Sequence, residues 1–186
     1  MMNLIRDVLA YSQLSKEHQE MISTDLNEIA VHAIADFDLI IEQKSAHITF
    51  TRLPTIDAIP LQMSQLFGNL ISNSLKYSRE GVPPVIDISS ELLTSERAVG
   101  YGLSPEGIWY ALTFRDNGIG FKPEHSAQIF NIFQRLHGKN EFAGTGIGLA
   151  ICKKIALNHQ GDIFAAGESG VGATFTVVLP LHPLSR

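Results

Sequence analysis

The sequence predicts an α+β protein, a two-layer α/β sandwich in which three helices cover a mixed, mostly antiparallel sheet of about five strands. Apolar residues recur at helical spacing in the segments assigned to the covering helices. Shorter segments alternate between apolar and polar residues or run apolar, as strands do. Glycine and proline clusters separate these segments and mark the turns.

The segments of the N-terminal half are predicted to form helices around one strand. Residues 1–20 carry an apolar stripe that needs either another helix or its own domain as a partner, namely Leu4, Ile5, Val8, Leu9 and Tyr11. A second helix begins after a cap at residues 24–25. Its apolar face comprises Leu26, Ile29, Ala30, Ala33, Phe37, Ile40 and Ile41. Residues 46–52 alternate like a strand, and a third helix begins at Pro60 and ends near Tyr77.

The C-terminal half is predicted to supply most of the sheet. A glycine-containing hairpin over residues 100–107 joins its first two strands. The long connection over residues 117–144 contains a short helix near 127–136, and connections of that length are usually functional. A fourth helix begins near Gly146 and ends before Gly161, and the chain after Pro180 is expected to be loose. The predicted strands are residues 85–93, 108–115, 162–166 and 173–179.

Bulk composition limits the classes of function. The 186 residues are 45% hydrophobic and 18% charged, which suits one packed domain with a short appendage. The net charge is −5 and no basic run occurs, so we expect no nucleic-acid partner. A nucleotide ligand stays compatible with the acidic balance, because backbone N–H groups and a metal can hold phosphates.

Cysteine and histidine usage indicates a reducing compartment without a zinc site. Cys152 is the single cysteine and is interpreted as a small core residue. No apolar run approaches the ~18–20 residues of a membrane span, so we expect a cytoplasmic location. The double Met at the start suggests a fragment, and a membrane anchor in a longer parent stays open. The histidines, without metal spacing, are read as surface or core residues: His18, His32, His47, His125, His137, His159 and His182.

The third predicted helix carries an amide-rich polar stripe. Its members fall within an arc of roughly 100° around the helix: Gln62, Gln65, Asn69, Ser72, Asn73 and Lys76. An ordinary solvated face is one interpretation. The other is a polar pocket, in which the Asn73 amide ligates Mg²⁺, Lys76 reaches phosphates and Tyr77 lies against a sugar or base.

The motif DNGIG at residues 116–120 directly follows a predicted strand. A carboxylate at a strand end, here Asp116, can accept a hydrogen bond from the exocyclic amino group of adenine. Gly118 and Gly120 let the backbone turn and approach a flat ligand closely. A plain Asx-type turn is the alternative interpretation.

Three alternating glycines, Gly144, Gly146 and Gly148, lead into the fourth predicted helix. They expose a run of N–H groups at a helix N-terminus, which suits a phosphate. A glycine-rich helix cap is the alternative, and a P-loop is excluded because no Gly-Lys-Ser/Thr follows.

Aromatic residues gather inside the long connection, with Phe130 and Phe133 near Arg135. They form either a cluster that pins the connection or part of a lid, from which Arg135 and Lys139 close over a triphosphate.

Taken together, these segments resemble the histidine-kinase branch of the gyrase-type ATP-binding superfamily. The resemblance covers residues 24–180, in that family's order. Its N box, first glycine box, phenylalanine box, second glycine box and last glycine-containing strand are similar to residues 65–77, 116–120, 129–135, 144–149 and 167–175.

The resemblance implies ATP and Mg²⁺ as cofactors. It implies that Asn73 holds the metal, that Asp116 selects adenine and that residues 117–144 form a mobile ATP lid. Thr174 is implied near the adenine pocket. The full implied set of ATP-binding residues is Asn69, Asn73, Lys76, Tyr77, Asp116, Gly118, Gly120, Phe133, Arg135, Gly144, Thr145, Gly146, Gly148, Leu149 and Thr174.

The resemblance also implies domains and partners. Residues 1–22 are similar to the end of the second helix of a dimerisation and phosphoacceptor hairpin, residues 23–181 to an ATP-binding catalytic domain, and residues 182–186 to a tail. The implied parent is a homodimeric kinase that phosphorylates a histidine of its hairpin and acts on a response regulator. No histidine here has the acceptor context, so we expect this chain to bind ATP without phosphorylating itself at the family's site.

Two other functions stay open. A hydrolytic ATPase of this superfamily would use a Glu one turn before the metal-binding Asn, where this chain has Asn69, and an amide is not a general base at neutral pH. A non-catalytic module that senses nucleotide or docks a partner is the second alternative, and a titration without Mg-ATP affinity would favour it.

Overall fold

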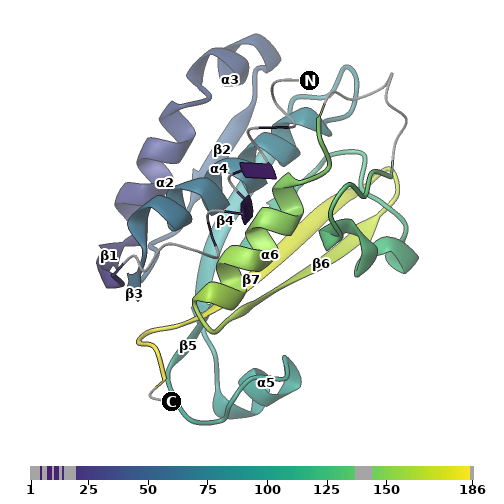
Figure 1. The fold of residues 1–186 in the computed structure, drawn as a ribbon. Helices are drawn as coiled ribbons and strands as arrows, with labels where there is room; N and C mark the ends of the chain where they lie inside the picture. The colour runs from purple at the N-terminus through teal and green to yellow at the C-terminus, as the bar shows by residue number, and fades with distance from the viewer. Residues whose placement is uncertain are drawn as a thin grey trace.

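The fold is a two-layer sandwich of helices on one sheet (Figure 1). The computed structural model describes residues 5, 8, 9, 11, 12, 14, 20–136 and 144–184. Within these residues, five strands form a mixed sheet in the order β2-β4-β5-β7-β6, in which only the β2–β4 pair is parallel. The strands are β2 (His47–Phe50), β4 (Val85–Leu92), β5 (Trp109–Asp116), β6 (Asp162–Glu168) and β7 (Gly172–Pro180). The predicted fold class is confirmed.

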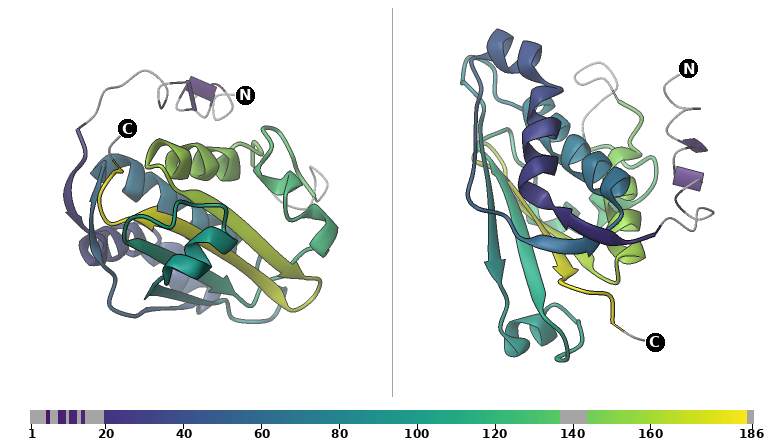
Figure 2. Two further views of the ribbon diagram at one scale, coloured as in Figure 1. Left: turned by 90° about the horizontal axis from the view of Figure 1, so that it is seen from below. Right: turned by 90° about the vertical axis from the view of Figure 1, so that its left-hand side faces the viewer.

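Three helices cover one face of this sheet, as predicted: α2 (Leu26–Ala35), α4 (Pro60–Lys76) and α6 (Gly148–Asn158). The Asp25 carboxylate caps α2 by accepting the Asn27 N–H at 2.8 Å, and Pro60 occupies the first position of α4. Phe67 of α4 packs edge-on against Phe114 of β5, with ring centroids 5.0 Å apart. The helix faces and the sheet therefore share one apolar core. Figure 2 (right) shows the helices on one side of the sheet.

The second predicted helix is shorter than expected. It ends at Ala35, and a separate helix, α3 (Asp38–Lys44), follows the turn at Phe37. No residue of α3 is buried, so an apolar periodicity alone carried the prediction too far. Lys44 gives α3 a fixed contact, because its ammonium donates to the Leu75 carbonyl oxygen at 2.7 Å, at the end of α4.

Three short elements were not predicted. The strands β1 (Ile22–Asp25) and β3 (Thr55–Ala58) pair antiparallel in a small second sheet. The strands β4 and β5 pair antiparallel, as expected of strands joined through residues 100–107, but the excursion between them also contains α5 (Ser95–Gly100), capped by Thr94. This excursion forms a second small core, comprising Leu93, Ala98, Trp109, Ala111 and Val178.

The chain after Pro180 is not loose over residues 181–184, which corrects the prediction. Gln160 holds Leu184 in both directions: its amide oxygen accepts the Leu184 N–H at 2.7 Å, and its amide nitrogen donates to the Leu184 carbonyl. The Leu181 carbonyl accepts the Asp57 N–H at 2.9 Å. These bonds tie the end of β7 back onto the domain.

The helix predicted over residues 1–20 lies largely outside the described residues. Of those described, Ile5, Val8 and Leu9 are helical and exposed. Tyr11 and Leu14 pack against the main core, and the Leu14 carbonyl accepts a hydrogen bond from Asn158 of α6. No helix in the described part of the chain is long and apolar enough to cross a membrane.

Candidate nucleotide-binding site

A cavity between α4, α6 and the sheet brings distant segments together. It lies where β5 ends, and the long connection after β5 closes one side of it. This connection contains two 3₁₀ turns, η1 (Pro123–His125) and η2 (Gln128–Phe130), in place of the short helix expected there. The lining residues are Asn73, Tyr77, Asp116, Ile119, Gly120, Phe121, Ile129, Gln134, Arg135, Leu136, Leu149, Ala173 and Phe175.

Asp116 is held from three elements. Its Oδ1 accepts the backbone N–H groups of Gly118 at 2.9 Å and of Ala173 at 3.1 Å. Its Oδ2 accepts the Ser74 hydroxyl of α4 at 3.0 Å. Burial raises the pKa of this carboxyl above its ordinary value, and the three hydrogen bonds oppose that rise. One lone-pair direction of Oδ2 stays available to a donor in the cavity.

Two of the predicted glycines fit only because they lack a side chain. A Cβ on Gly118 would lie 2.5 Å from the Tyr77 carbonyl oxygen. Gly120 has φ +61, and a Cβ there would lie 1.9 Å from the Glu168 carbonyl oxygen. The close approach of this loop to α4 and to the β6–β7 turn forms the floor of the cavity beside Asp116.

The end of α4 supplies an amide, an ammonium and a phenol. Asn73 lines the cavity, and its side chain makes no hydrogen bond with any residue that the structure describes. The Lys76 ammonium donates to the Tyr77 hydroxyl at 3.0 Å and lies 4.4 Å from the centroid of that ring. It also lies against Gly144, where an added Cβ would be 2.6 Å from Nζ. Lys76 therefore joins α4 to the glycine-rich segment.

The glycine-rich segment meets both α4 and the long connection. The Asn69 amide donates to the Gly148 carbonyl oxygen at 3.4 Å, at the start of α6. Gly146 has φ +76, and its carbonyl oxygen accepts the Phe133 N–H at 3.0 Å. Thr145, between the first two glycines, is half-buried. The segment thus bridges the N box helix and the connection.

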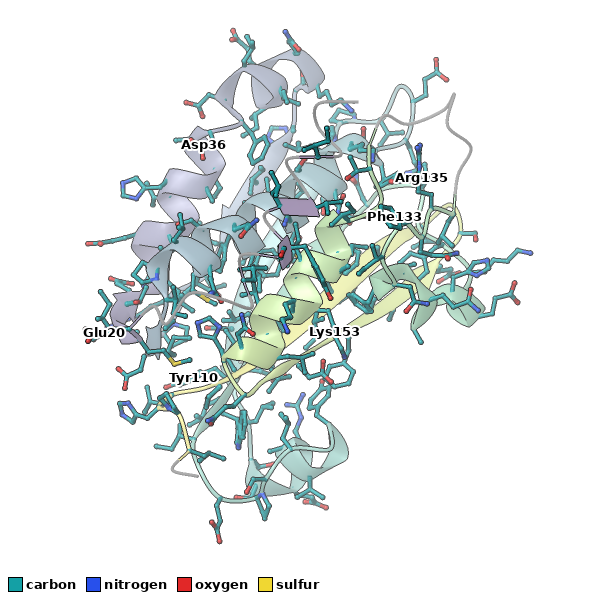
Figure 3. All side chains as sticks on the ribbon, viewed as in Figure 1. Glu20, Asp36, Tyr110, Phe133, Arg135 and Lys153 are labelled. Carbon is teal, nitrogen blue, oxygen red and sulfur yellow. The ribbon has the colours of Figure 1, made fainter. Side chains whose placement is uncertain are left out.

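The aromatic part of the long connection brings Arg135, but not Phe133, to the cavity. Arg135 and Leu136 line the cavity, whereas Phe133 is 59% exposed and does not. Figure 3 shows the labelled Phe133 and Arg135 side chains beside the beginning of α6. Lys139, which was expected to close over phosphates, lies outside the described residues.

The structure does not bring Thr174 to this cavity. Residues alternate along β7, so Ala173 and Phe175 line the cavity while Thr174 lines a hollow on the other face of the sheet. The pairing of Ala173 with Asp116 sets that alternation. The sequence prediction placed the correct strand at the site but chose the wrong face.

Several residues of the site were missed by the sequence prediction. Ser74 does not line the cavity but supports it from behind, through its hydrogen bond to Asp116, and its polar character on a buried helix face was the available signal. The missed lining residues are Ile119, Phe121, Ile129, Gln134, Leu136, Ala173 and Phe175. Most are apolar, and nothing distinguishes them in sequence from ordinary core residues.

The donor set fits a magnesium ion held mainly by a nucleotide. Nowhere in residues 20–136 and 144–184 do three or more His, Cys, Asp or Glu converge on a metal-sized site. The Asn73 amide, without a described hydrogen-bond partner, offers one neutral oxygen. Mg²⁺ accepts few protein ligands when phosphates and water complete its octahedron, so this arrangement suits the ion.

Sequence comparison identifies the family. The model of the family described as "Histidine kinase-, DNA gyrase B-, and HSP90-like ATPase" matches residues 58–183. These residues include most of the cavity: α4, the DNGIG motif and the glycine-rich segment. The chain belongs to this ATPase family. It is an ATP-binding domain of the kind found in sensor histidine kinases.

The curated relatives are phytochromes and sensor kinases. The chain is 40% identical over 186 residues to cyanobacterial phytochrome A of Nostoc sp. and 35% identical over 181 residues to the phytochrome-like protein Cph1 of Synechocystis sp.. It is 25% identical over 190 residues to the sensor histidine kinase RcsC of Escherichia coli. The match covers 100%, 97% and 98% of this chain but only 22%, 22% and 18% of those proteins.

Solved structures share the fold. Full-length ShkA, in complex with AMPPNP, matches 98% of this chain and 36% of its own with a TM-score of 0.76 and 21% identity. The catalytic domain of histidine kinase ThkA matches 89% of this chain and 98% of its own with a TM-score of 0.69 and 22% identity.

Proposed function

We propose that this chain donates the γ-phosphoryl group of Mg-ATP to a histidine on the dimerisation hairpin of its own sensor kinase. The observation that carries the proposal is the shared cavity, into which Asn73, Asp116 and Arg135 converge from three segments. Membership of the ATPase family and the likeness to sensor kinases support it.

The base end of the cavity suits adenine. The exocyclic amino group would donate to Oδ2 of Asp116, which already has a fixed orientation. Apolar side chains, among them Ile119 and Phe175, offer flat contacts for the purine ring. Guanine carries a carbonyl at the same ring position, and a carboxylate would repel it.

The phosphate end would be formed by the end of α4 and the start of α6. Asn73 is the residue that would hold Mg²⁺, and the bound ion would neutralise charge that develops on the phosphates. Lys76 and Arg135 are the cations near the cavity that would contact phosphate oxygens. The N–H groups at the start of α6 would add a positive end of a helix dipole.

In the transfer step, a ring nitrogen of the acceptor histidine attacks the γ-phosphorus in line with the bridging oxygen. The new N–P bond forms while the bond from phosphorus to that oxygen breaks, and ADP leaves. The phosphorylated imidazole then loses its remaining ring proton to solvent. A neutral imidazole needs no general base to expose its lone pair, so positioning is the main requirement on this chain.

Hydrolysis is disfavoured as the main reaction because of Asn69. This residue would be placed to activate water in a hydrolytic relative, but its amide is not basic and donates instead to the Gly148 carbonyl. The acceptor is therefore proposed to be a histidine, delivered by a dimerisation hairpin. Residues 1–22 would be the end of the second helix of that hairpin. The parent would be a cytoplasmically oriented homodimer that acts on a response regulator.

A reconstituted transfer reaction tests this function. The chain is mixed with a separate hairpin that carries an acceptor histidine, together with Mg²⁺ and γ-labelled ATP. We expect acid-labile label on the hairpin and none on a hairpin whose acceptor is replaced by Gln. Phosphate release without any acceptor would favour the hydrolytic ATPase, and a chain without Mg-ATP affinity would favour neither enzyme.

A further inference from the structure

Ser74 is a buried polar residue that the proposed reaction does not use. It lies on the covered side of α4 and is 3% exposed. Its hydroxyl donates to Oδ2 of Asp116, 42 residues along the chain, at 3.0 Å. Buried hydroxyls need a hydrogen-bond partner, and the partner of Ser74 is the carboxylate that faces the cavity.

The two oxygens of Asp116 have different environments. Oδ1 accepts two backbone N–H groups, from Gly118 and Ala173, which use both of its lone pairs. Oδ2 accepts only the Ser74 hydroxyl among the described residues, so it is the oxygen with a free lone pair for a ligand. Ser74 consequently determines the direction in which that lone pair points.

We propose that Ser74 is a positioning residue for base selection, whose hydroxyl keeps one oxygen of the Asp116 carboxylate charged and directed at the ligand's six-position. The inference rests on the proposed nucleotide function. It assigns adenine selectivity to a pair of side chains rather than to the carboxylate alone.

The other charged groups around Asp116 would not change when Ser74 is altered. From the connection, Arg135 lines the same cavity; after α4, Arg79 donates to the Asn117 carbonyl oxygen. Lys76 and Tyr77 pair with each other at the end of α4. A second hollow, which Asp116 itself also borders, is lined by Asp87, Arg115 and Glu168, and none of these three is bonded to Ser74. Ser74→Ala therefore isolates one donor.

Loss of that donor should change how the site treats two purines. Adenine presents an amino donor at its six-position and hypoxanthine a carbonyl acceptor, so a charged carboxylate prefers adenine and a protonated one tolerates hypoxanthine. Burial already raises the pKa of Asp116, and the Ser74 hydrogen bond opposes that rise. Without the hydroxyl, the carboxyl should accept a proton at higher pH, and the preference should be lost at higher pH.

The test compares affinities for Mg-ADP and Mg-IDP from pH 5 to pH 8. In wild type we expect a preference for ADP that is constant near neutral pH and declines in acid. Ser74→Ala should move the midpoint of this decline to higher pH and reduce the preference several-fold near pH 6. Ser74→Thr retains the hydroxyl and should keep the wild-type midpoint. Ser64→Ala is the matched control, because Ser64 lies on the same helix and, among the described residues, its hydroxyl bonds to the Pro60 carbonyl alone.

Separate outcomes overturn the inference and the function. A Ser74→Ala variant with the wild-type midpoint and preference overturns the role of Ser74 alone, as does an equal loss of both nucleotides at every pH. If Ser74→Ala does not fold, Ser74→Cys fills the site with a weaker donor, and its midpoint should still shift upward. A wild-type chain that binds neither nucleotide overturns the proposed function and this inference with it.

Discussion

The base end and the phosphate end of the candidate site are built differently. At the base end, Asp116 receives three hydrogen bonds from three elements before any ligand arrives. At the phosphate end, the Asn73 amide has no described hydrogen-bond partner, and the Lys76 ammonium is bonded to the neighbouring Tyr77 hydroxyl. The difference suggests that the base end is preorganised for recognition, whereas the phosphate end is organised by the nucleotide and its metal. Substitutions at the two ends should therefore separate binding from transfer.

The largest effect is expected at Asn73, on transfer. Asn73→Ala removes the proposed metal ligand, and the transfer rate to a separate hairpin should fall by about 10³-fold, since a bound ion is worth several kcal/mol in the transition state. Asn73→Asp, which keeps an oxygen ligand for Mg²⁺, should retain part of the activity. Labelling assays at saturating ATP would measure both. Wild-type transfer by Asn73→Ala would contradict the metal role.

Gly120→Ala should destabilise the base end. The added Cβ would lie 1.9 Å from the Glu168 carbonyl oxygen in a backbone with φ +61, so both contact and strain oppose it, by about 2–4 kcal/mol. Gly81→Ala is the matched control, since Gly81 has φ +71 with open space around it and should cost only about 1 kcal/mol. Urea unfolding would give both values. Equal costs would mean that the close approach does not matter.

Asp116→Asn should weaken binding of adenine nucleotides rather than unfold the domain. Loss of the charged acceptor should cost about 1–3 kcal/mol, or roughly 5- to 150-fold in the dissociation constant of Mg-ADP, by calorimetry. Asp87→Asn, an exposed carboxylate on the neighbouring β4, serves as the control. If both variants bind Mg-ADP as wild type does, the assignment of adenine selection to Asp116 is wrong.

A smaller effect, on stability, is expected at His159, away from the site. Its Nε2 accepts the Ile59 N–H at 3.0 Å, its Nδ1 lies 2.8 Å from the Ile155 carbonyl, and burial lowers the pKa of the ring below 6.5. Because the unfolded chain binds the second ring proton of His159 more tightly than the folded chain does, protonation favours unfolding. The contribution of His159 to the free energy of unfolding is therefore complete above about pH 6.5 and decreases below it, by at most about 1.4 kcal/mol per pH unit.

Unfolding free energies between pH 5 and pH 7.5 would test the role of His159. His159→Asn should flatten the dependence on pH, whereas the exposed His32→Asn should not. If the unfolding free energy of His159→Asn varies with pH as steeply as that of wild type, His159 is not the source of the dependence.

Sequence reasoning succeeded where local chemistry determined structure. Pro60 marks the start of α4, Asp25 caps α2, and Asp116 follows a strand, so each is visible from its neighbours. It failed where contacts with residues far along the chain determine the local structure. The excursion with α5 is held by contacts to Trp109 and Val178 on the sheet, which no local periodicity reveals.

The candidate site was also predictable only in part. The cavity brings together Asn73, Tyr77, Asp116, Gly120, Arg135 and Leu149 from the predicted set. Thr174 was misplaced because the face of a strand depends on its register, here the pairing of Ala173 with Asp116. Ser74 was missed because its partner lies on another element.

An amide-resolved NMR titration of the chain with Mg-ATP tests most directly whether one cavity receives base and phosphates together. The account predicts that the N–H signals of Gly118, Ala173 and Gly148 shift with a common dissociation constant, although these residues lie on three separate segments. Shifts confined to another hollow, such as that lined by Lys44 and Pro84, or no saturable shift at all, would contradict it.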